Sequence, residues 1–269
     1  MTDPAGATSP DPERPTPPGA GPEVADAPLD PSALGPLIAR GRDAEVYAVG
    51  EDRVARRLPT PRDLTGEAAV MEHVRSAGYP VPRVWRVAPG EVVLERVEGP
   101  TMLDDLGSHP WRVDRHARTL ADLHRRLHRI PAPTDLAAHP WPGEVVLHLD
   151  LHPANVILAP AGPVVIDWTN ARRGGAGADL AEVWVIVATL GRDADPSGLA
   201  DRVREAVVGR VEGRIRARLL AGFLAGDARD QARDALPTTA EVRLRDPHVS
   251  PAEAEAIRAL VRRETGARL

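Results

Sequence analysis

The sequence contains no cysteine among its 269 residues, which excludes a disulfide framework and a thiolate metal site. It also contains no lysine, so each of its 34 basic residues is an arginine and chemistry that requires a lysine amine is excluded. Aromatic residues make up only 3% of the chain, the net charge is −5, and no basic stripe interleaved with aromatics occurs. These features argue against a nucleic-acid-binding protein.

Long hydrophobic runs are also missing. No apolar stretch approaches the roughly 20 residues that cross a bilayer, and the N-terminus lacks the basic start and apolar run of a secretory signal. We therefore expect no membrane association and a cytoplasmic location, with the chain acting as a monomer or a homodimer. Hydrophobic residues form 42% of the sequence, enough for one large domain or for two lobes that share a cleft.

The first third of the chain divides into a tail and a small lobe. Residues 1–32 hold hardly any large apolar side chain, and this composition predicts a disordered acidic tail rich in Pro and Ala. Residues 33–97 predict a mostly antiparallel sheet with one helix laid on it, because short apolar strands flank a helical pattern. The expected elements are strands at 44–49, 53–58, 83–88 and 91–96, a turn at 50–52 and a helix at 62–77.

The remaining residues, 98–269, predict a larger and mostly helical lobe. Leu120, Leu123 and Leu127 are spaced along one face of a helix. Residues 180–190 are apolar almost all round, as expected of a helix buried inside a lobe. Further helices are expected over 196–226 and 252–263, and short strands at 145–149, 156–158 and 164–166. The predicted fold class is α+β, with two lobes.

A group of polar residues lies where the first of these short strands ends. His148, Asp150 and His152 alternate along the strand exit, and Pro153 then prevents further strand pairing. The next two strands flank the turn P-A-G-P and should fold back antiparallel. The simplest register sets Ala159 opposite Val164.

This register brings Asn155 and Asp167 close together beside Asp150, because directly opposed residues lie about 5 Å apart. In an ideal ladder the two side chains face opposite ways. Either a one-residue slip at the turn or the departure of Asn155 from the ladder would let both reach one point. Two oxygen ligands of this kind suit Mg²⁺, which completes its shell with water and substrate phosphates. The sequence therefore predicts a substrate that carries phosphate.

The motif resembles the catalytic centre of known kinases. The spacing from Asp150 to Asn155 equals that in the kinase loop H-R-D-L-x-x-x-N, and Asp167 follows a short hairpin as the D-F-G aspartate does. The wording H-x-D-x-H-P-x-N followed by I-D-W is similar to the aminoglycoside phosphotransferase and choline kinase family. The resemblance implies a two-lobed, protein-kinase-like fold and transfer of the γ-phosphate of ATP, or alternatively GTP, to a hydroxyl group.

The resemblance also implies roles for the residues of the motif. Asp150 would accept or orient the proton of the acceptor hydroxyl, while Asn155 and Asp167 would hold Mg²⁺ that bridges the nucleotide phosphates. His148 and His152 would support the loop. Asp179 matches a position that anchors this loop from a helix start, and an ordinary helix N-cap is an equal alternative for it. His124 and His128, four residues apart, are interpreted as part of a solvated helix face.

The N-terminal lobe can be aligned with the same family. Arg57 occupies the place where a lysine grips the nucleotide phosphates, with Arg56 as the second choice, and Glu67 is the helix glutamate that would pair with this cation. The loop that contains Gly41 would cover the phosphates, although it has one glycine instead of three. Glu95 to Val97 would form the hinge whose backbone binds adenine.

Alternative interpretations remain at this stage. Taken singly, Asp150, Asn155 and Asp167 fit turn or cap positions. His148, Asp150 and His152 could be the transition-metal ligands of a hydrolase. The missing lysine and the single loop glycine fit a nucleotide-binding pseudokinase.

The resemblance implies a small hydroxylated acceptor of open identity. An antibiotic such as an aminoglycoside or a macrolide, a nucleoside antibiotic, a sugar and an amino alcohol all fit the motif. Residues 201–269, which shape the acceptor side in the resembled family, carry 14 arginines against 11 acids. This balance argues against a polycationic acceptor.

Overall fold

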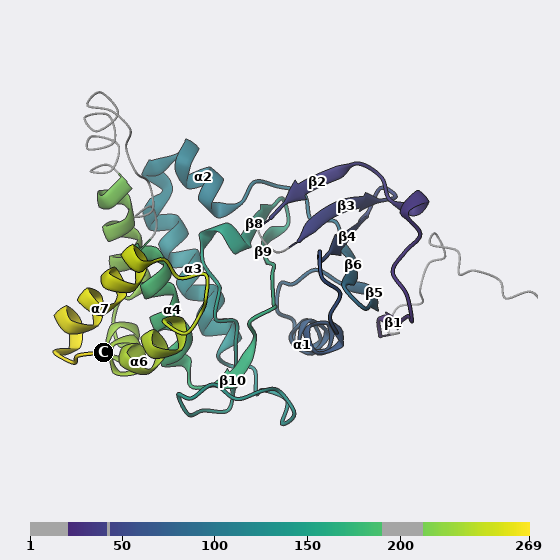
Figure 1. Ribbon diagram of the computed structural model, residues 1–269. Coiled ribbons are helices and arrows are strands. Elements are labelled where there is room, and N and C mark those ends of the chain that lie inside the picture. The colour runs from purple at the N-terminus through teal and green to yellow at the C-terminus, as the bar shows by residue number, and fades with distance from the viewer. Residues whose placement is uncertain (1–20, 42–43, 190–211) are drawn as a thin grey trace, which may run out of the picture. The chain divides into compact units, whose positions relative to one another are not determined.

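The computed structural model describes residues 21–41, 44–189 and 212–269 (Figure 1). The chain forms two compact units. The first comprises the described residues up to Glu72 together with Pro82–Arg96, and the second comprises His73–Val81 and the described residues from Val97 onward. The change of unit after Arg96 lies next to the lobe boundary expected from the sequence, whereas the assignment of His73–Val81 to the second unit was not expected.

The first unit is a six-stranded sheet with the strand order β1-β5-β6-β4-β3-β2. It consists of β1 (Glu23–Val24), β2 (Leu37–Arg40), β3 (Glu45–Val49), β4 (Arg53–Arg57), β5 (Val84–Ala88) and β6 (Glu91–Glu95). All neighbours pair antiparallel except β1 and β5, which are parallel. The four predicted strands are confirmed, and so is the turn between β3 and β4, where Gly50 adopts a φ of 63° that favours glycine.

Helix α1 (Thr65–Ser76) confirms the helix predicted between these strands. It begins three residues later than predicted because Asp63 accepts a hydrogen bond from the backbone N–H of Thr65 at 2.8 Å and so caps the first turn. The sheet and α1 together give the small α+β unit that the sequence predicts.

The predicted tail boundary at residue 32 is wrong, because residues 21–32 take part in the first unit. Strand β1 pairs with β5, and a short 3₁₀ helix, η1, covers Pro31–Ala33. The backbone N–H of Leu29 donates to the buried carboxylate of Glu91 at 2.8 Å. Backbone pairing, a buried carboxylate and the packing of Leu29 against the core order this segment, although it holds few large apolar side chains. Residues 1–20 of the predicted tail lie outside the described residues.

The second unit is mostly helical, as predicted. Its helices are α2 (Met102–Ser108), α3 (Val113–Leu127), α4 (Ala176–Thr189), α6 (Ala228–Arg243) and α7 (Pro251–Thr265), with short 3₁₀ helices η2 (Pro110–Arg112) and η3 (Pro153–Asn155). Its strands form two antiparallel pairs, β7 (Val145–Leu147) with β10 (Arg172–Gly174), and β8 (Val156–Ala159) with β9 (Gly162–Val165). Of the helices predicted over 196–226, residues 212–223 are helical and residues 190–211 lie outside the described part.

Helix α4 forms the centre of the second unit. As the sequence predicts, it is buried on all sides, and it packs against α6 and α7 (Figure 1). The close approach of α4 to α6 depends on Gly177, where an added Cβ atom would lie 2.5 Å from the carbonyl oxygen of Gln231. In the described residues, no helix combines the length and the apolar character needed to cross a membrane.

Two Gly→Ala changes near helix ends should have opposite effects, because Gly177 of α4 contacts α6 closely and Gly107 of α2 has open space around it. Alanine is the better helix former, so Gly107→Ala, where an added Cβ meets nothing within 4 Å, should raise the free energy of unfolding by up to about 1 kcal/mol. Gly177→Ala should lower it by about 1–3 kcal/mol, because the added methyl group overpacks the contact. Urea unfolding of both variants measures the difference; equal effects would contradict the close approach of the two helices.

Candidate active site

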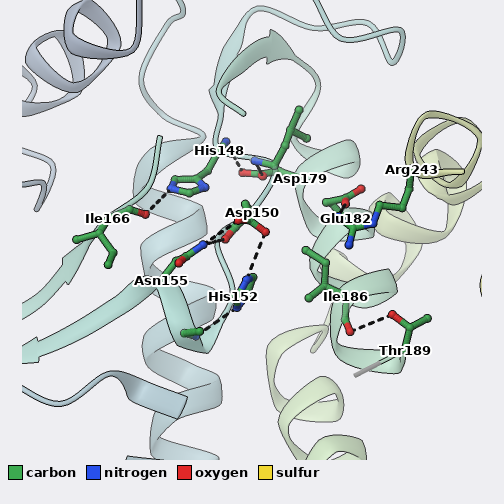
Figure 2. Close-up of polar contacts among 12 residues, drawn as sticks. His148, Asp150, His152, Asn155, Ile166, Asp179, Glu182, Ile186, Thr189 and Arg243 are labelled. Atoms are coloured by element: carbon green, nitrogen blue, oxygen red, sulfur yellow. Dashed lines mark hydrogen bonds and ion pairs between the residues drawn. The ribbon is translucent and has the colours of Figure 1, made fainter. Parts of the chain in front are cut away.

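Asp179 of α4 binds the backbone of the segment that follows β7. The carboxylate of Asp179 accepts hydrogen bonds from the backbone N–H groups of His148 at 3.3 Å and Leu149 at 2.7 Å (Figure 2). Leu149 has a φ of 60°, in the left-handed region that a branched side chain rarely adopts. The two hydrogen bonds stabilise this turn, which Asp150 follows directly.

Asp179 itself is fully buried and is held in its ionised form. Burial alone would raise the pKa of Asp179, but the hydrogen bond from His128 Nε2 at 2.9 Å and the electrostatic influence of the nearby histidines lower it well below its usual value. The buried carboxylate thus retains a charge that strengthens its hydrogen bonds to the loop.

The interpretation of His124 and His128 as a solvated helix face is wrong. His124 is buried against Phe223, and His128 is mostly buried and donates to Asp179. His124 lies four residues after Leu120, on the stripe that also contains Leu123 and Leu127, so the spacing of the leucines could have placed it inside. The adjacent arginines obscured this pattern.

His148 connects the loop to the strand that precedes Asp167. Its ring is buried, its Nε2 donates to the carbonyl oxygen of Ile166 at 3.1 Å, and it packs on the ring of Trp168 with a centroid distance of 4.6 Å. Burial lowers the pKa of His148 against the opposing influence of Asp179, Asp150 and Asp167, so the ring is neutral and Nε2 carries its proton.

Asp150 is oriented by two neighbouring side chains. The amide nitrogen of Asn155 donates to Asp150 Oδ2 and to its backbone carbonyl, both at 2.9 Å, and His152 Nε2 lies 3.3 Å from Asp150 Oδ1 (Figure 2). His152 Nδ1 accepts from the backbone N–H of Ala154 at 3.2 Å, so the proton of a neutral His152 ring is on Nε2 and faces Asp150. The side chain of Asp150 is 23% exposed, which leaves it accessible to a substrate.

The hairpin register differs from the predicted one by two residues. Ala159 pairs with Gly162 and Val156 with Val165, because the turn contains two residues and not four. Asn155 has left the ladder and ends η3, which is one of the two routes expected to let its side chain reach the same point as that of Asp167. The sequence could not distinguish these routes because the register depends on the length of the turn, which is fixed by the pairing of the two strands.

The structure brings the backbone of Asn155 next to that of Asp167. The carbonyl oxygen of Asn155 accepts from the N–H of Ile166 at 3.0 Å, and Asp167 follows directly, exposed and with a φ of 63°. Both hydrogen bonds from the Asn155 side chain use its nitrogen, so its oxygen is the atom suited to a cation. An amide oxygen and a carboxylate are the hard donors that Mg²⁺ prefers, and the residues present fit that ion.

In the first unit, Glu67 pairs with Arg56 and not with Arg57, which corrects the predicted pair. Side chains alternate along a strand, so consecutive residues of β4 face opposite sides of the sheet, and Arg56 is the one that faces α1. Arg57 donates instead to Glu91 Oε2 at 2.6 Å and to the carbonyl oxygen of Leu29. Arg57 therefore secures the N-terminal segment to the sheet.

The other residues assigned to nucleotide binding lie at the ends of strands. Gly41 follows β2 and donates its N–H to the carbonyl of Ala44 at 2.8 Å, and the two residues between them lie outside the described residues. Glu95 ends β6, and its N–H donates to the carbonyl of Arg83 at 2.9 Å. Val97 is half-buried and begins the main part of the second unit.

The geometry gives no support to a metal-dependent hydrolase. His148 directs Nε2 to the backbone carbonyl of Ile166, whereas His152 directs Nε2 to Asp150, so the three side chains are not grouped as the ligands of one metal ion. Across the three described ranges, no three His, Asp or Glu residues are grouped so that they could hold a metal ion.

The buried His124 predicts a pH dependence of stability. Burial lowers its pKa to about 4 from an ordinary value near 6.5, so as pH falls through this interval the unfolded chain takes up a proton that the folded chain cannot. The stabilisation is present above pH 6.5 and is lost toward pH 4. Between pH 7 and pH 5, His124→Leu should lose about 2 kcal/mol less unfolding free energy than the wild type.

Urea unfolding at the two pH values measures this difference. The control is His248→Leu, which changes an exposed side chain and should keep the pH dependence of the wild type. Equal losses in the wild type and His124→Leu would show that His124 is not neutral in the folded protein.

Comparison with known proteins identifies the family of the chain. Residues 35–143 and 135–233 match the family model of the phosphotransferase enzyme family (APH). No curated protein sequence matches the chain.

Solved structures of aminoglycoside phosphotransferases share the fold. A complex of APH(2″)-IIa with streptomycin and ATP has a TM-score of 0.53 at 12% identity over 80% of this chain and 89% of that one. A thermostable mutant of APH(4)-Ia with ADP and hygromycin B gives 0.51 at 14% identity over 88% and 96%, and ADP-bound APH(2″)-Ib gives 0.51 at 11% over 85% and 91%. The predicted kinase-like α+β fold is thereby confirmed, and the chain belongs to the APH phosphotransferase family, whose members transfer phosphate to hydroxyl acceptors.

Proposed function

We propose that the protein transfers the γ-phosphoryl group of ATP to a hydroxyl group of a small organic acceptor. The observation that carries this proposal is the arrangement of Asp150 and Asn155, joined by hydrogen bonds at 2.9 Å on a loop that Asp179 holds in a left-handed turn. Phosphoryl transfer needs little covalent participation by the protein, so catalysis depends on positioning and on charge stabilisation. GTP is an alternative donor. The proposal includes a cytoplasmic location, where these nucleotides are available.

Asp150 is the proposed catalytic residue. Asn155 and His152 fix the orientation of its carboxylate, and its exposed fraction allows an acceptor hydroxyl to approach. Asp150 would accept or orient the hydroxyl proton as the oxygen attacks phosphorus. No phosphoenzyme is needed, since the acceptor oxygen attacks the nucleotide directly.

Asn155 and Asp167 would hold Mg²⁺, which supplies charge neutralisation on the nucleotide phosphates when it is bound. His148 supports this pair from below, because it links the loop to Ile166, the residue before Asp167. The neutral His148 ring leaves the negative charge of Asp167 available to the cation.

Arg56 takes the place of the missing lysine in this proposal. It is 13% exposed and pairs with Glu67 of α1, so its guanidinium is held in one orientation. An arginine presents a planar fork with several donors and can contact two phosphate oxygens at once. Glu67 is a positioning residue for this group, and the loop at Gly41 and the Glu95–Val97 segment remain the proposed contacts of phosphate and adenine.

The change Asp150→Asn should lower kcat at least about 100-fold, because the amide cannot accept the hydroxyl proton. The full chain with Mg²⁺ and ATP, assayed for nucleotide turnover over a panel of hydroxylated compounds, provides the measurement. Asp230→Asn, on the exposed face of α6, is the matched control and should keep wild-type turnover.

Turnover that survives in Asp150→Asn would sink the proposed mechanism. Wild-type protein that binds ATP but turns over none of it would favour the pseudokinase, the second candidate, which is suggested by the absence of lysine.

The two adjacent arginines of β4 should respond differently to truncation. Arg56→Ala should raise KM for ATP about tenfold, the typical cost of losing a hydrogen bond between charged groups, and it should also lower the unfolding free energy because it removes a partner of the largely buried Glu67. Arg57→Ala should lower the unfolding free energy by about 1–3 kcal/mol because it removes a partner of the buried Glu91, and it should leave KM for ATP nearly unchanged. A raised KM for ATP in Arg57→Ala together with an unchanged KM in Arg56→Ala would show that Arg57, and not Arg56, takes the place of the lysine.

A further inference from the structure

A pocket of about 200 Å³ opens in the second unit beside the turn that presents Asp150. Leu149, the left-handed residue of that turn, is part of its wall. The polar side chains that line it come from three places, the segment after Asp167, helix α4 and the end of α6, and are those of Asn170, Arg172, Glu182, Arg243 and Asp246. All of these residues belong to the second unit.

Glu182 is the least expected member of this wall. It is the one acid on the apolar surface of α4 after Asp179, one turn away from it, and only 8% of its side chain is exposed. A buried carboxyl group is costly unless another group compensates it. Arg243 of α6 compensates part of this cost, and the carboxyl group also lines the pocket, where it can meet a ligand.

The position of Glu182 relates the pocket to the proposed chemistry. In Figure 2 it lies between Asp150 and Arg243, and Arg243 contacts Glu182 Oε1 at 3.3 Å and Glu253 at 3.2 Å. Within the described part of the chain, Arg243 donates to Oε1 of Glu182. Oε2 is therefore the carboxyl oxygen that can meet a ligand. The carboxylate of Asp150 is close enough to influence the ionisation of Glu182.

The charged groups of the wall already have protein partners. Arg243 is placed between two carboxyl groups, Arg172 donates to the carbonyl oxygen of Ala171 at 2.8 Å, and Asp246 accepts from the backbone N–H of His248 at 2.9 Å. A ligand that carried its own charges would have to compete with these pairs. Hydroxyl groups can share them, because each donates one hydrogen bond and accepts others.

The sum of the charges also argues against a cation. With Glu182 ionised, two acids balance two arginines. Burial raises the pKa of Glu182 to about 8, more than the adjacent Arg243 lowers it, and a protonated Glu182 removes one negative charge. His139, another wall residue, is neutral because burial lowers its pKa. In neither state of Glu182 does the wall carry the excess negative charge that a polycation needs.

The size of the pocket sets a further limit. Pockets that enclose drug-sized ligands measure roughly 300–1,000 Å³, so about 200 Å³ suits a smaller group. We propose that this pocket binds the acceptor and that the acceptor is an uncharged, polyhydroxylated molecule the size of one sugar ring, with Glu182 and Asn170 as specificity-determining residues. This inference rests on the proposed phosphotransferase function.

The first test compares acceptors with the full chain and Mg²⁺–ATP. The probes are neutral monosaccharides, cyclitols and nucleosides on one side, and streptomycin, gentamicin and hygromycin B on the other. At least one neutral compound should be phosphorylated with a kcat/KM about tenfold above each aminoglycoside, because a site built for hydroxyl groups discriminates strongly by hydrogen bonding.

A higher kcat/KM for an aminoglycoside would overturn the inference, and so would the absence of any neutral substrate while ATP hydrolysis without acceptor proceeds. Loss of ATP hydrolysis itself would count against the phosphotransferase proposal, so the two failures are distinguishable.

The second test changes the wall. Glu182→Gln keeps a group that donates and accepts, so KM for the best neutral acceptor should stay within about threefold, whereas Glu182→Leu should raise it at least about tenfold. Asn170→Ala, at an exposed position that carries no risk for folding, should raise it about three- to tenfold, and Gln231→Ala, an exposed amide outside the pocket, should not.

KM for ATP, measured in parallel, should change less than twofold in these variants. Equal losses in Glu182→Gln and Glu182→Leu would indicate that the acceptor needs a negative charge there, and an unchanged acceptor KM in both Glu182→Leu and Asn170→Ala would remove the pocket from acceptor binding.

Discussion

The buried carboxylate of Asp179 is the group on which the site depends. It accepts hydrogen bonds from two consecutive backbone N–H groups of the loop and one from the His128 ring. The loop contains Leu149 in a left-handed conformation, which costs free energy for a branched residue and persists only if the surroundings stabilise it. An ionised acceptor in a region without water makes stronger hydrogen bonds than a neutral one, so the charge on Asp179 offsets the unfavourable turn.

This anchor also determines what the loop presents. Because Asp179 fixes Leu149, Asp150 is placed where Asn155 and His152 contact its two carboxyl oxygens. On the other side of the same turn, Leu149 contributes to the wall of the pocket that contains Glu182. One helix therefore carries both the residue that orients the proposed base and the residue proposed to recognise the acceptor, three positions apart.

Every basic side chain of this protein is an arginine, including the one proposed to take the place of the phosphate-binding lysine. The neighbouring Arg56 and Arg57 have the same chemistry, and the alternation of side chains along β4 separates their environments. One pairs with the helix glutamate and is suited to phosphate, while the other pairs with the buried Glu91 and holds the segment around Leu29. The composition shows that neither residue can be a lysine. Only the tertiary structure shows which arginine faces α1 and which one pairs with Glu91.

The sequence alone determined the fold class, the family resemblance and the central motif, because these depend on local periodicity and on fixed spacings. The apolar alternation of β3 to β6 and the all-round apolar character of α4 are properties of short segments, and the interval from Asp150 to Asn155 is carried by one loop. Tertiary structure decided everything that depends on contacts between distant segments. The turn between β8 and β9 contains two residues because Ala159 pairs with Gly162. A turn of four residues would give the same apolar pattern, so the sequence does not distinguish the two. The burial of His124 and His128, the pairing of Glu67 with Arg56, the ordering of residues 21–32 and the pocket around Glu182 arise between residues that are far apart in the chain, and no local rule of sequence contains them.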